Sequence, residues 1–73
     1  YRTINGRIDL LIGTTDYLYI IELKFNGTAK QAIEQIRNKD YSLPFELQGR
    51  KIFKIGANVS KETRNIEEWI IEA

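Results

Sequence analysis

The chain has 73 residues and a net charge of +1, and it is 42% apolar and 29% charged, which is the balance of one ordinary globular domain. It contains neither cysteine nor histidine, which excludes disulfides, thiolate and imidazole metal ligands, and histidine-based catalysis. A metal site in this chain therefore has to use oxygen ligands, which favours Mg²⁺, Mn²⁺ or Ca²⁺.

The distribution of apolar and charged residues indicates the setting. The longest apolar stretch, residues 17–21, is too short to span a membrane, and the first residues do not have the charged and apolar regions expected of a signal peptide. We therefore expect a cytoplasmic domain without a membrane partner. Residues 1–54 carry nine Lys or Arg and six Asp or Glu, whereas residues 55–73 carry two Lys or Arg and four Glu. This is either a mixed solvated surface or a modest basic side compatible with phosphate contact.

The first half of the chain predicts two strands joined by a tight turn. Residues 7–12 are rich in β-formers, and residues 13–16 form a turn cluster. Residues 17–25 are apolar on both faces until their end, which is typical of a central strand covered on both sides. Because the turn is short, we expect an antiparallel hairpin.

A helix and a further strand are predicted next. Asn26-Gly27 breaks the second strand and Thr28 is a suitable N-cap. Apolar residues at helical spacing then predict a helix over about 29–39. After a loop, residues 51–58 predict a strand. A strand-helix-strand crossover is right-handed, so the two strands it joins should be parallel. The expected fold class is α/β, with a mixed sheet of the α+β kind.

The tail allows two interpretations. Ile66, Trp69, Ile70 and Ala73 fit helical spacing, which slightly favours a helix, yet residues 66–72 also fit an edge strand.

Charged residues interrupt the two apolar strands of the hairpin. Glu22 and Lys24 point to one face of their strand because side chains alternate. A tight loop at Thr15-Asp16 would place Asp9 directly across from Glu22, with Cβ atoms about 4.5–5.5 Å apart. A surface ion-pair cluster is the plainer interpretation. However, charges in otherwise apolar strands contradict the local pattern, and such conflicts concentrate at functional sites.

These residue types suit phosphodiester cleavage. Two carboxylates can share one hard cation, with the carbonyl of Leu23 as a third metal contact and water as the remaining ligands. A metal held in this way lowers the pKa of its bound water and withdraws charge from the phosphate. A lysine beside it can position that water or stabilise charge on the phosphoryl oxygens.

The same residues resemble those of a known family. Gly6-Arg7-Ile8-Asp9 followed by Ile21-Glu22-Leu23-Lys24 resembles the PD-(D/E)XK nuclease superfamily, although Ile8 stands where the family name has proline. Gln31-Ala32-Ile33-Glu34-Gln35-Ile36, leading to Tyr41, resembles the helix after the catalytic strand of that family. The resemblance covers nearly the whole chain. It is most similar to the branch fused behind an AAA-ATPase-like domain in bacterial proteins.

The resemblance implies a role for each site residue. Asp9 and Glu22 would be metal ligands for Mg²⁺ or Mn²⁺, and Lys24 would be the catalytic lysine. Gln35 would be the polar residue that the helix directs at the site, although an exposed glutamine is the plainer interpretation. Arg7 would either contact phosphate or form an ion pair with Glu22.

The resemblance also bears on the fold. It favours a strand over residues 66–72 in a restriction-endonuclease-like core. Only residues 1–5 precede Gly6, so the single domain over residues 1–73 is expected to lack the N-terminal helix and first strand of the family.

Together these observations predict a metal-dependent nuclease that hydrolyses phosphodiester bonds of nucleic acid, with DNA as the expected partner. The resemblance implies an ATPase-like domain N-terminal to this one in the parent chain. A catalytically silent nucleic-acid-binding or regulatory module is an alternative. Another is an oligomerisation domain that forms a homodimer through its apolar end, Trp69-Ile70-Ile71.

Overall fold

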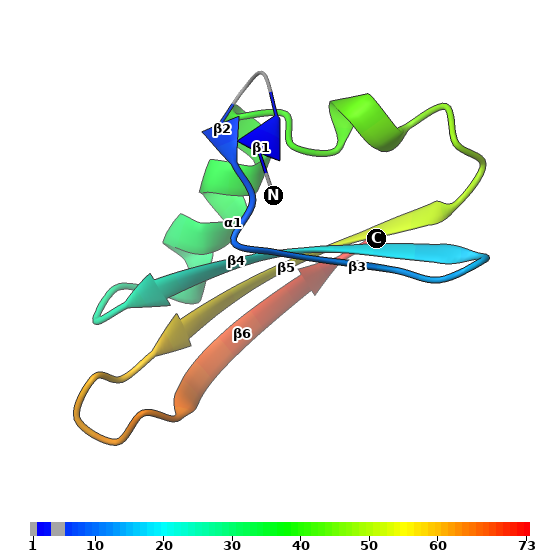
Figure 1. Ribbon diagram of the computed structural model, residues 1–73. Helices are drawn as coiled ribbons and strands as arrows, with labels where there is room; N and C mark the ends of the chain where they lie inside the picture. Colours follow the sequence, from blue (N-terminus) through cyan, green and yellow to red (C-terminus); the bar gives the residue numbers. More distant parts are fainter. Residues whose placement is uncertain (1, 4–5) are drawn as a thin grey trace.

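The computed structural model describes residues 2–3 and 6–73, and its main feature is a mixed four-stranded sheet with one helix on one face (Figure 1). The strands lie in the order β3 (Leu10–Gly13), β4 (Tyr17–Phe25), β5 (Lys51–Val59) and β6 (Ile66–Glu72). β4 pairs antiparallel with β3 and parallel with β5, and β6 is an antiparallel edge strand. The predicted fold class, with its hairpin, its parallel strand and a strand at the tail, is confirmed.

Helix α1 (Ala29–Asn38) connects the two parallel strands and begins at a capping box. The Thr28 side chain accepts a hydrogen bond from the Gln31 amide, and the Gln31 side chain accepts one from the Thr28 amide, both at 3.0 Å. These bonds satisfy two amides that a helix start leaves unpaired. Within the described residues, no helix is long and apolar enough to cross a membrane.

The end of α1 directs the chain into the core. Asp40 adopts a left-handed conformation with a φ of 49°. The Asp40 amide donates to the Arg37 carbonyl and the Tyr41 amide donates to the Ile36 carbonyl, which is the hydrogen-bond pattern of a Schellman motif. Tyr41 is consequently buried, and the short 3₁₀ helix η1 (Leu43–Phe45) follows and buries Phe45 beside it.

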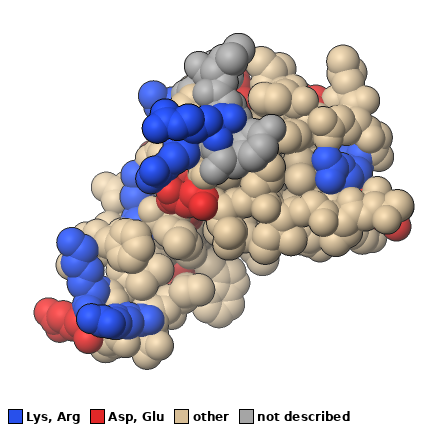
Figure 2. Space-filling view, in the orientation of Figure 1, with Lys and Arg blue, Asp and Glu red and all other residues tan. Residues whose placement is uncertain are grey.

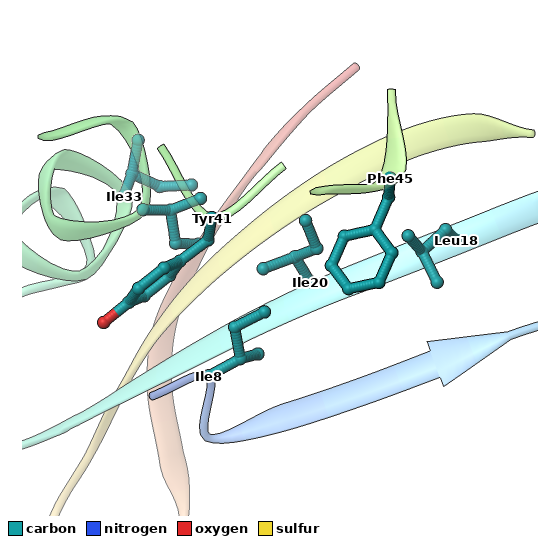
Figure 3. Packing of buried hydrophobic residues seen from close by; sticks show 7 residues of the cluster. Ile8, Leu18, Ile20, Ile33, Tyr41 and Phe45 are labelled. Carbon is teal, nitrogen blue, oxygen red and sulfur yellow. The ribbon is translucent and has the colours of Figure 1, made fainter. Parts of the chain in front are cut away.

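The core lies between the sheet and the segment that runs from α1 to η1 (Figure 3). Gly56 of β5 allows the helix to approach closely, because a Cβ there would lie 2.7 Å from the Ile33 amide nitrogen and 2.8 Å from the Ala29 carbonyl oxygen. The buried cluster consists of Ile8, Leu18, Ile20, Ile33, Ile36, Tyr41 and Phe45.

The predicted strand over residues 7–12 is wrong in one respect, because it is interrupted. Gly6–Arg7 form the short strand β2, which pairs with β1 (Arg2–Thr3) outside the main sheet, and β3 begins only at Leu10. Between them Ile8 turns into the core and is 0% exposed, while Asp9 lies in a bend. The burial of Ile8 explains why the chain leaves the ladder at this point.

The face of the sheet away from α1 is open and apolar. The pairing registers put alternate residues of all four strands on it, and Lys51 is its one charged member in the regular ladder. Tyr19 and Phe53 stack there with ring centroids 5.4 Å apart. We call this surface the open face. Its most exposed side chains are Leu10, Ile12, Tyr17, Phe25, Ile66, Trp69 and Ile71.

Candidate metal and catalytic site

Asp9 and Glu22 meet where β3 stops pairing with β4. The register of the hairpin, with Leu10 opposite Ile21, would put Asp9 opposite Glu22 if the ladder continued by one residue. Asp9 instead lies in the bend, and its Oδ2 accepts a hydrogen bond from the Leu23 amide at 3.0 Å. The Asp9 side chain therefore takes the place of a backbone partner at the free edge of β4.

The Leu23 carbonyl is directed toward the same edge. In a strand, the amide N–H and the carbonyl of one residue point to the same neighbouring strand. Because the Leu23 N–H reaches Asp9, its carbonyl oxygen also projects to the side of Asp9 and away from β5. The sequence-based expectation that this oxygen lies within reach of the carboxylates is compatible with this geometry.

Gln35 links Glu22 to Lys24 from the facing helix. Its Nε2 donates to Glu22 Oε1 at 2.9 Å, and its Oε1 accepts a hydrogen bond from Lys24 Nζ. The half-buried glutamine is therefore directed into the site and is not the exposed helix residue of the plainer interpretation. The amide group of Gln35 therefore contacts the Lys24 ammonium through its oxygen and the Glu22 carboxyl through its nitrogen.

Tyr41 is a contact of the site that the sequence analysis did not single out. Its hydroxyl lies 3.5 Å from Gln35 Nε2. The ring packs in the core, and its hydroxyl points away from Phe45 and Leu18 (Figure 3). The signal in the sequence is a tyrosine directly after the helix C-cap region, where the Schellman motif favours an apolar residue that turns back onto the helix.

Glu22 is a buried carboxyl that lacks a sufficient partner. The side chain is 4% exposed, and no donor in the described residues reaches its Oε2. The pKa of Glu22 is raised from 4.5 to about 7, first by burial and then by the hydrogen bond and the negative charge of the neighbouring Asp9 carboxyl. Lys24 and Arg7 oppose this rise through their positive charges but do not cancel it.

Arg7 lies at the outer side of the site. Its Nη2 is 3.9 Å from Asp9 Oδ1, and its side chain is 67% exposed. The ion pair therefore involves Asp9, and the suggested pair with Glu22 is not the one the structure contains. Arg2 lies opposite Arg7 in the β1–β2 pair, so two arginines are adjacent here.

The residues present fit a hard divalent cation. Glu22 Oε2 is buried without a donor among the described residues, and the Asp9 carboxylate and the Leu23 carbonyl lie at the same edge of β4. Within residues 2–3 and 6–73 no group of three or more acidic residues is arranged to hold a metal, so the acidic ligands would be two. Mg²⁺ is commonly bound by one or two carboxylates and several waters.

A cleft leads to Lys24 and Gln35 from the far end of β4. It measures about 560 Å³ and is lined by these two side chains, by the turn after β4 and by one side of α1. Polar side chains of Gln31, Glu34 and Asn38 contribute to its wall. Lys24 and Gln35 are therefore accessible from outside, although Glu22 itself is buried.

A mixed sheet with a crossover helix and two carboxylates, a lysine and a glutamine at the edge of its central strand is a nuclease-like core. The family model of the PD-(D/E)XK nuclease superfamily matches residues 1–69, and the chain belongs to this superfamily. A curated relative is described as an uncharacterized protein in the vnfD 5' region of Azotobacter chroococcum mcd 1. It is 27% identical over an alignment of 73 positions, which covers 97% of this chain and 14% of that protein. The chain thus spans about one seventh of the length of this relative. No solved structure matches the chain.

Proposed function

We propose that this domain is a metal-dependent phosphodiesterase that cleaves nucleic acid, with DNA as the expected substrate. The observation that carries the proposal is the buried Glu22 Oε2, which no donor of the described residues reaches, beside a second carboxylate and a lysine held by Gln35. A surface ion-pair cluster would not leave a buried carboxyl oxygen without a partner. A bound Mg²⁺ or Mn²⁺ would lower the pKa of its water and withdraw charge from the scissile phosphate.

Each side chain of the cluster has a distinct task in this proposal. Gln35 holds Oε1 of Glu22, so the carboxyl cannot rotate freely and Glu22 would be one of the residues that hold the cation. Asp9 is held by the Leu23 amide and contributes the second carboxylate. Lys24, oriented by Gln35, donates hydrogen bonds to the attacking water or to a phosphoryl oxygen as charge develops. The exposed guanidinium of Arg7 is available for a neighbouring phosphate.

The test uses the intact protein that contains this domain. Plasmid and single-stranded DNA and RNA are incubated with it in Mg²⁺ or Mn²⁺ and in chelator. We expect cleavage that depends on the metal and is lost in Lys24→Ala, with Lys30→Ala as the matched control because Lys30 is exposed on α1. Circular dichroism and urea unfolding establish that both variants are folded. Cleavage by Lys24→Ala at the wild-type rate would remove the lysine from the mechanism.

The open face favours a second candidate, a silent interaction module that pairs with a second copy of itself. At roughly 100 Å² for each half-exposed large side chain, its seven most exposed residues present roughly 700 Å². This approaches the ~800 Å² that each partner buries in a standard interface. Light scattering tests this candidate. A dimer that Trp69→Lys dissociates, together with no cleavage in any metal, would favour the module over the enzyme.

The ATPase-like domain expected N-terminal to this one is a further part of the proposal. The relative from Azotobacter is about seven times as long as the matched segment, so domains of this kind occur within longer polypeptides. Mass determination of the intact protein and sequencing of its N-terminal portion test this expectation directly.

A further inference from the structure

A second hollow adjoins the catalytic cleft at the end of β4. It measures about 650 Å³ and is lined by Phe25, Val59, Ser60, Lys61 and Arg64. Phe25 also lines the cleft that contains Lys24 and Gln35, so the two hollows share this residue. Phe25 is 56% exposed, and it lies at the carboxyl ends of the two parallel strands, where α/β sheets commonly bind ligands. We call this hollow the Phe25 pocket.

The walls of the Phe25 pocket are held in place by hydrogen bonds. The Asn26 amide donates to the Val59 carbonyl at 3.1 Å, and Asn26 Oδ1 accepts from the Lys61 amide at 3.3 Å. The β5–β6 loop is closed by bonds from the Ser60 amide to the Asn65 carbonyl and from the Arg64 amide to the Ser60 carbonyl. The pocket is consequently formed before any ligand arrives, which reduces the entropy cost of binding.

The charged residues of the pocket are all basic. Among the described residues, Lys61 and Arg64 line it and no carboxylate does. Within the same part of the chain, neither side chain takes part in an ion pair. Glu62 lies between them in sequence but does not line the pocket. An aromatic ring with two unpaired cations and a largely apolar wall is the combination that proteins use to bind unpaired nucleotides, because the ring stacks on a base and the cations hold the phosphates.

The rest of the open face differs from the Phe25 pocket in its charged residues. Around Trp69 and Ile71 the open face is apolar without basic residues in the ladder, which suits a protein surface. The end of the open face at Phe25 is bordered by Lys61 and Arg64. This difference favours an anionic ligand with a flat apolar part at Phe25 over a continuation of the protein-binding surface.

The position of the pocket relative to the catalytic cluster suits a polynucleotide. Phe25 follows Glu22 by three residues, which corresponds to about 10 Å along a strand, and its side chain lies on the opposite face at the end of β4. Figure 2 shows one group of Lys and Arg side chains against an acidic patch and a second group at the lower left, with an acidic side chain beside that second group. A polynucleotide that runs from Arg7 toward Lys61 and passes around the end of β4 would meet positive charge at both ends and the Phe25 ring at that end.

We propose that the Phe25 pocket binds one unpaired nucleotide of the substrate and makes single-stranded nucleic acid, or a frayed end, the preferred substrate. This inference rests on the proposed nuclease function for its biological meaning. The base stacks on Phe25, and Lys61 and Arg64 contact the adjacent phosphates. A duplex is disfavoured because each internal base is already stacked on both sides and offers no free face to the ring.

The test measures binding in chelator, so that it does not depend on cleavage. Fluorescence anisotropy compares a labelled oligothymidine of about 12 nucleotides with a hairpin duplex of similar length. We expect the intact protein to prefer the single strand, and Phe25→Ala to weaken its binding by about 5- to 100-fold. Phe25→Trp should retain the affinity. Ile71→Ala, an exposed residue elsewhere on the open face, is the matched control and should change it less than about twofold.

The salt dependence provides an independent readout. Replacement of Lys61 or Arg64 by glutamine should reduce the slope of log affinity against log salt by about 0.7 for each phosphate that the side chain neutralises in the wild type. Equal affinity for the duplex, or Phe25→Ala binding like Ile71→Ala in a folded protein, would overturn the inference even if cleavage is observed. Should Phe25→Ala fail to fold, unchanged salt slopes in the two glutamine variants would overturn it. Single-strand binding without any metal-dependent cleavage would refute only the nuclease proposal and would leave the inference about the Phe25 pocket standing.

Discussion

The raised pKa of Glu22 makes the stability of this protein depend on pH in an unusual direction. Below pH 4.5 the carboxyl is protonated in both the folded and the unfolded chain, so its burial has no electrostatic cost. As the pH rises through 4.5 the unfolded chain releases this proton first, whereas the folded protein retains it until about pH 7. The contribution of Glu22 to stability, which is fully present below pH 4.5, is therefore lost as the pH rises through 7.

The magnitude follows from the two pKa values. A rise from 4.5 to about 7 corresponds to about 3 kcal/mol of unfolding free energy, complete about one pH unit above 7. For a domain of this size such a loss is a large part of the total stability. Glu72 acts in the opposite direction, because its hydrogen bond with Arg37 lowers its pKa, so its contribution is lost only as the pH falls below 4.5.

Urea unfolding between about pH 5.5 and 8.5 in chelator isolates the effect of Glu22. We expect the wild-type protein to become progressively less stable across this range and Glu22→Gln to show a flatter profile, because the amide does not titrate. Glu46→Gln, at an exposed position in the loop, is the matched control and should follow the wild type. Parallel profiles for the wild type and Glu22→Gln would refute the argument.

Metal ions should reverse the loss. At about pH 8 an ion that binds the ionised Glu22 and Asp9 adds about 1.4 kcal/mol of stability for each tenfold excess over its Kd. We expect Mg²⁺ or Mn²⁺ to raise the stability of the wild type and not that of Glu22→Gln. Equal stabilisation of both proteins would show that the ion binds elsewhere.

Two further predictions concern the packing that positions the site. Gly56→Ala should destabilise the fold by about 1–3 kcal/mol, because the added Cβ would meet the Ile33 backbone. A free energy of unfolding in urea within about 0.5 kcal/mol of the wild-type value would contradict this prediction. Ile8→Ala should cost about 2–5 kcal/mol because Ile8 is fully buried at the break before Asp9. Ile12 is 45% exposed on the open face, so Ile12→Ala should lower the free energy of unfolding less in the same assay. Equal losses of unfolding free energy in the two variants would contradict the proposed role of Ile8 as an anchor.

Most of the fold follows from local signals in the sequence. The spacing of apolar residues predicts α1 to within a residue, and the continuous apolar run of β4 predicts a central strand. The two-residue loop Thr15-Asp16 fixes the hairpin register, since Thr14 pairs with Tyr17 at its base. A register fixed in this way determines which residue lies opposite Glu22, and for this reason the approach of Asp9 was predictable.

The tail was ambiguous for a physical reason. A β-bulge between Asn58 and Val59 leaves Glu67 as an extra residue in β6, so Ile66 and Trp69 lie on the same face although they are three residues apart. Three-residue spacing on one face is also the signature of a helix. The bulge depends on the pairing with β5, and no property of residues 66–72 alone distinguishes the two structures.

The break at Ile8 and Asp9 could not be derived from β-propensity. It depends on Tyr41 and Phe45, which lie far along the chain and form the core that Ile8 enters. The bridge by Gln35 likewise depends on how close α1 lies to β4. The closeness of the helix results from Gly56 on a third element. Contacts of this kind are set by tertiary packing, which local propensity does not encode.

The interruption that β-propensity does not predict is also the feature that creates the site. If β3 continued through Asp9, the Leu23 amide and carbonyl would pair with backbone and the Asp9 side chain would have no amide to hold it. Because the strand stops, the Leu23 amide bonds to the Asp9 side chain at the edge of β4, and the core gains Ile8 in compensation. The burial of apolar surface at Ile8 therefore offsets the unfavourable repulsion between Glu22 and Asp9 in the folded protein. In the proposed metal site the same repulsion would favour a cation, so the expected loss of stability above pH 7 and the proposed binding of metal would have one origin.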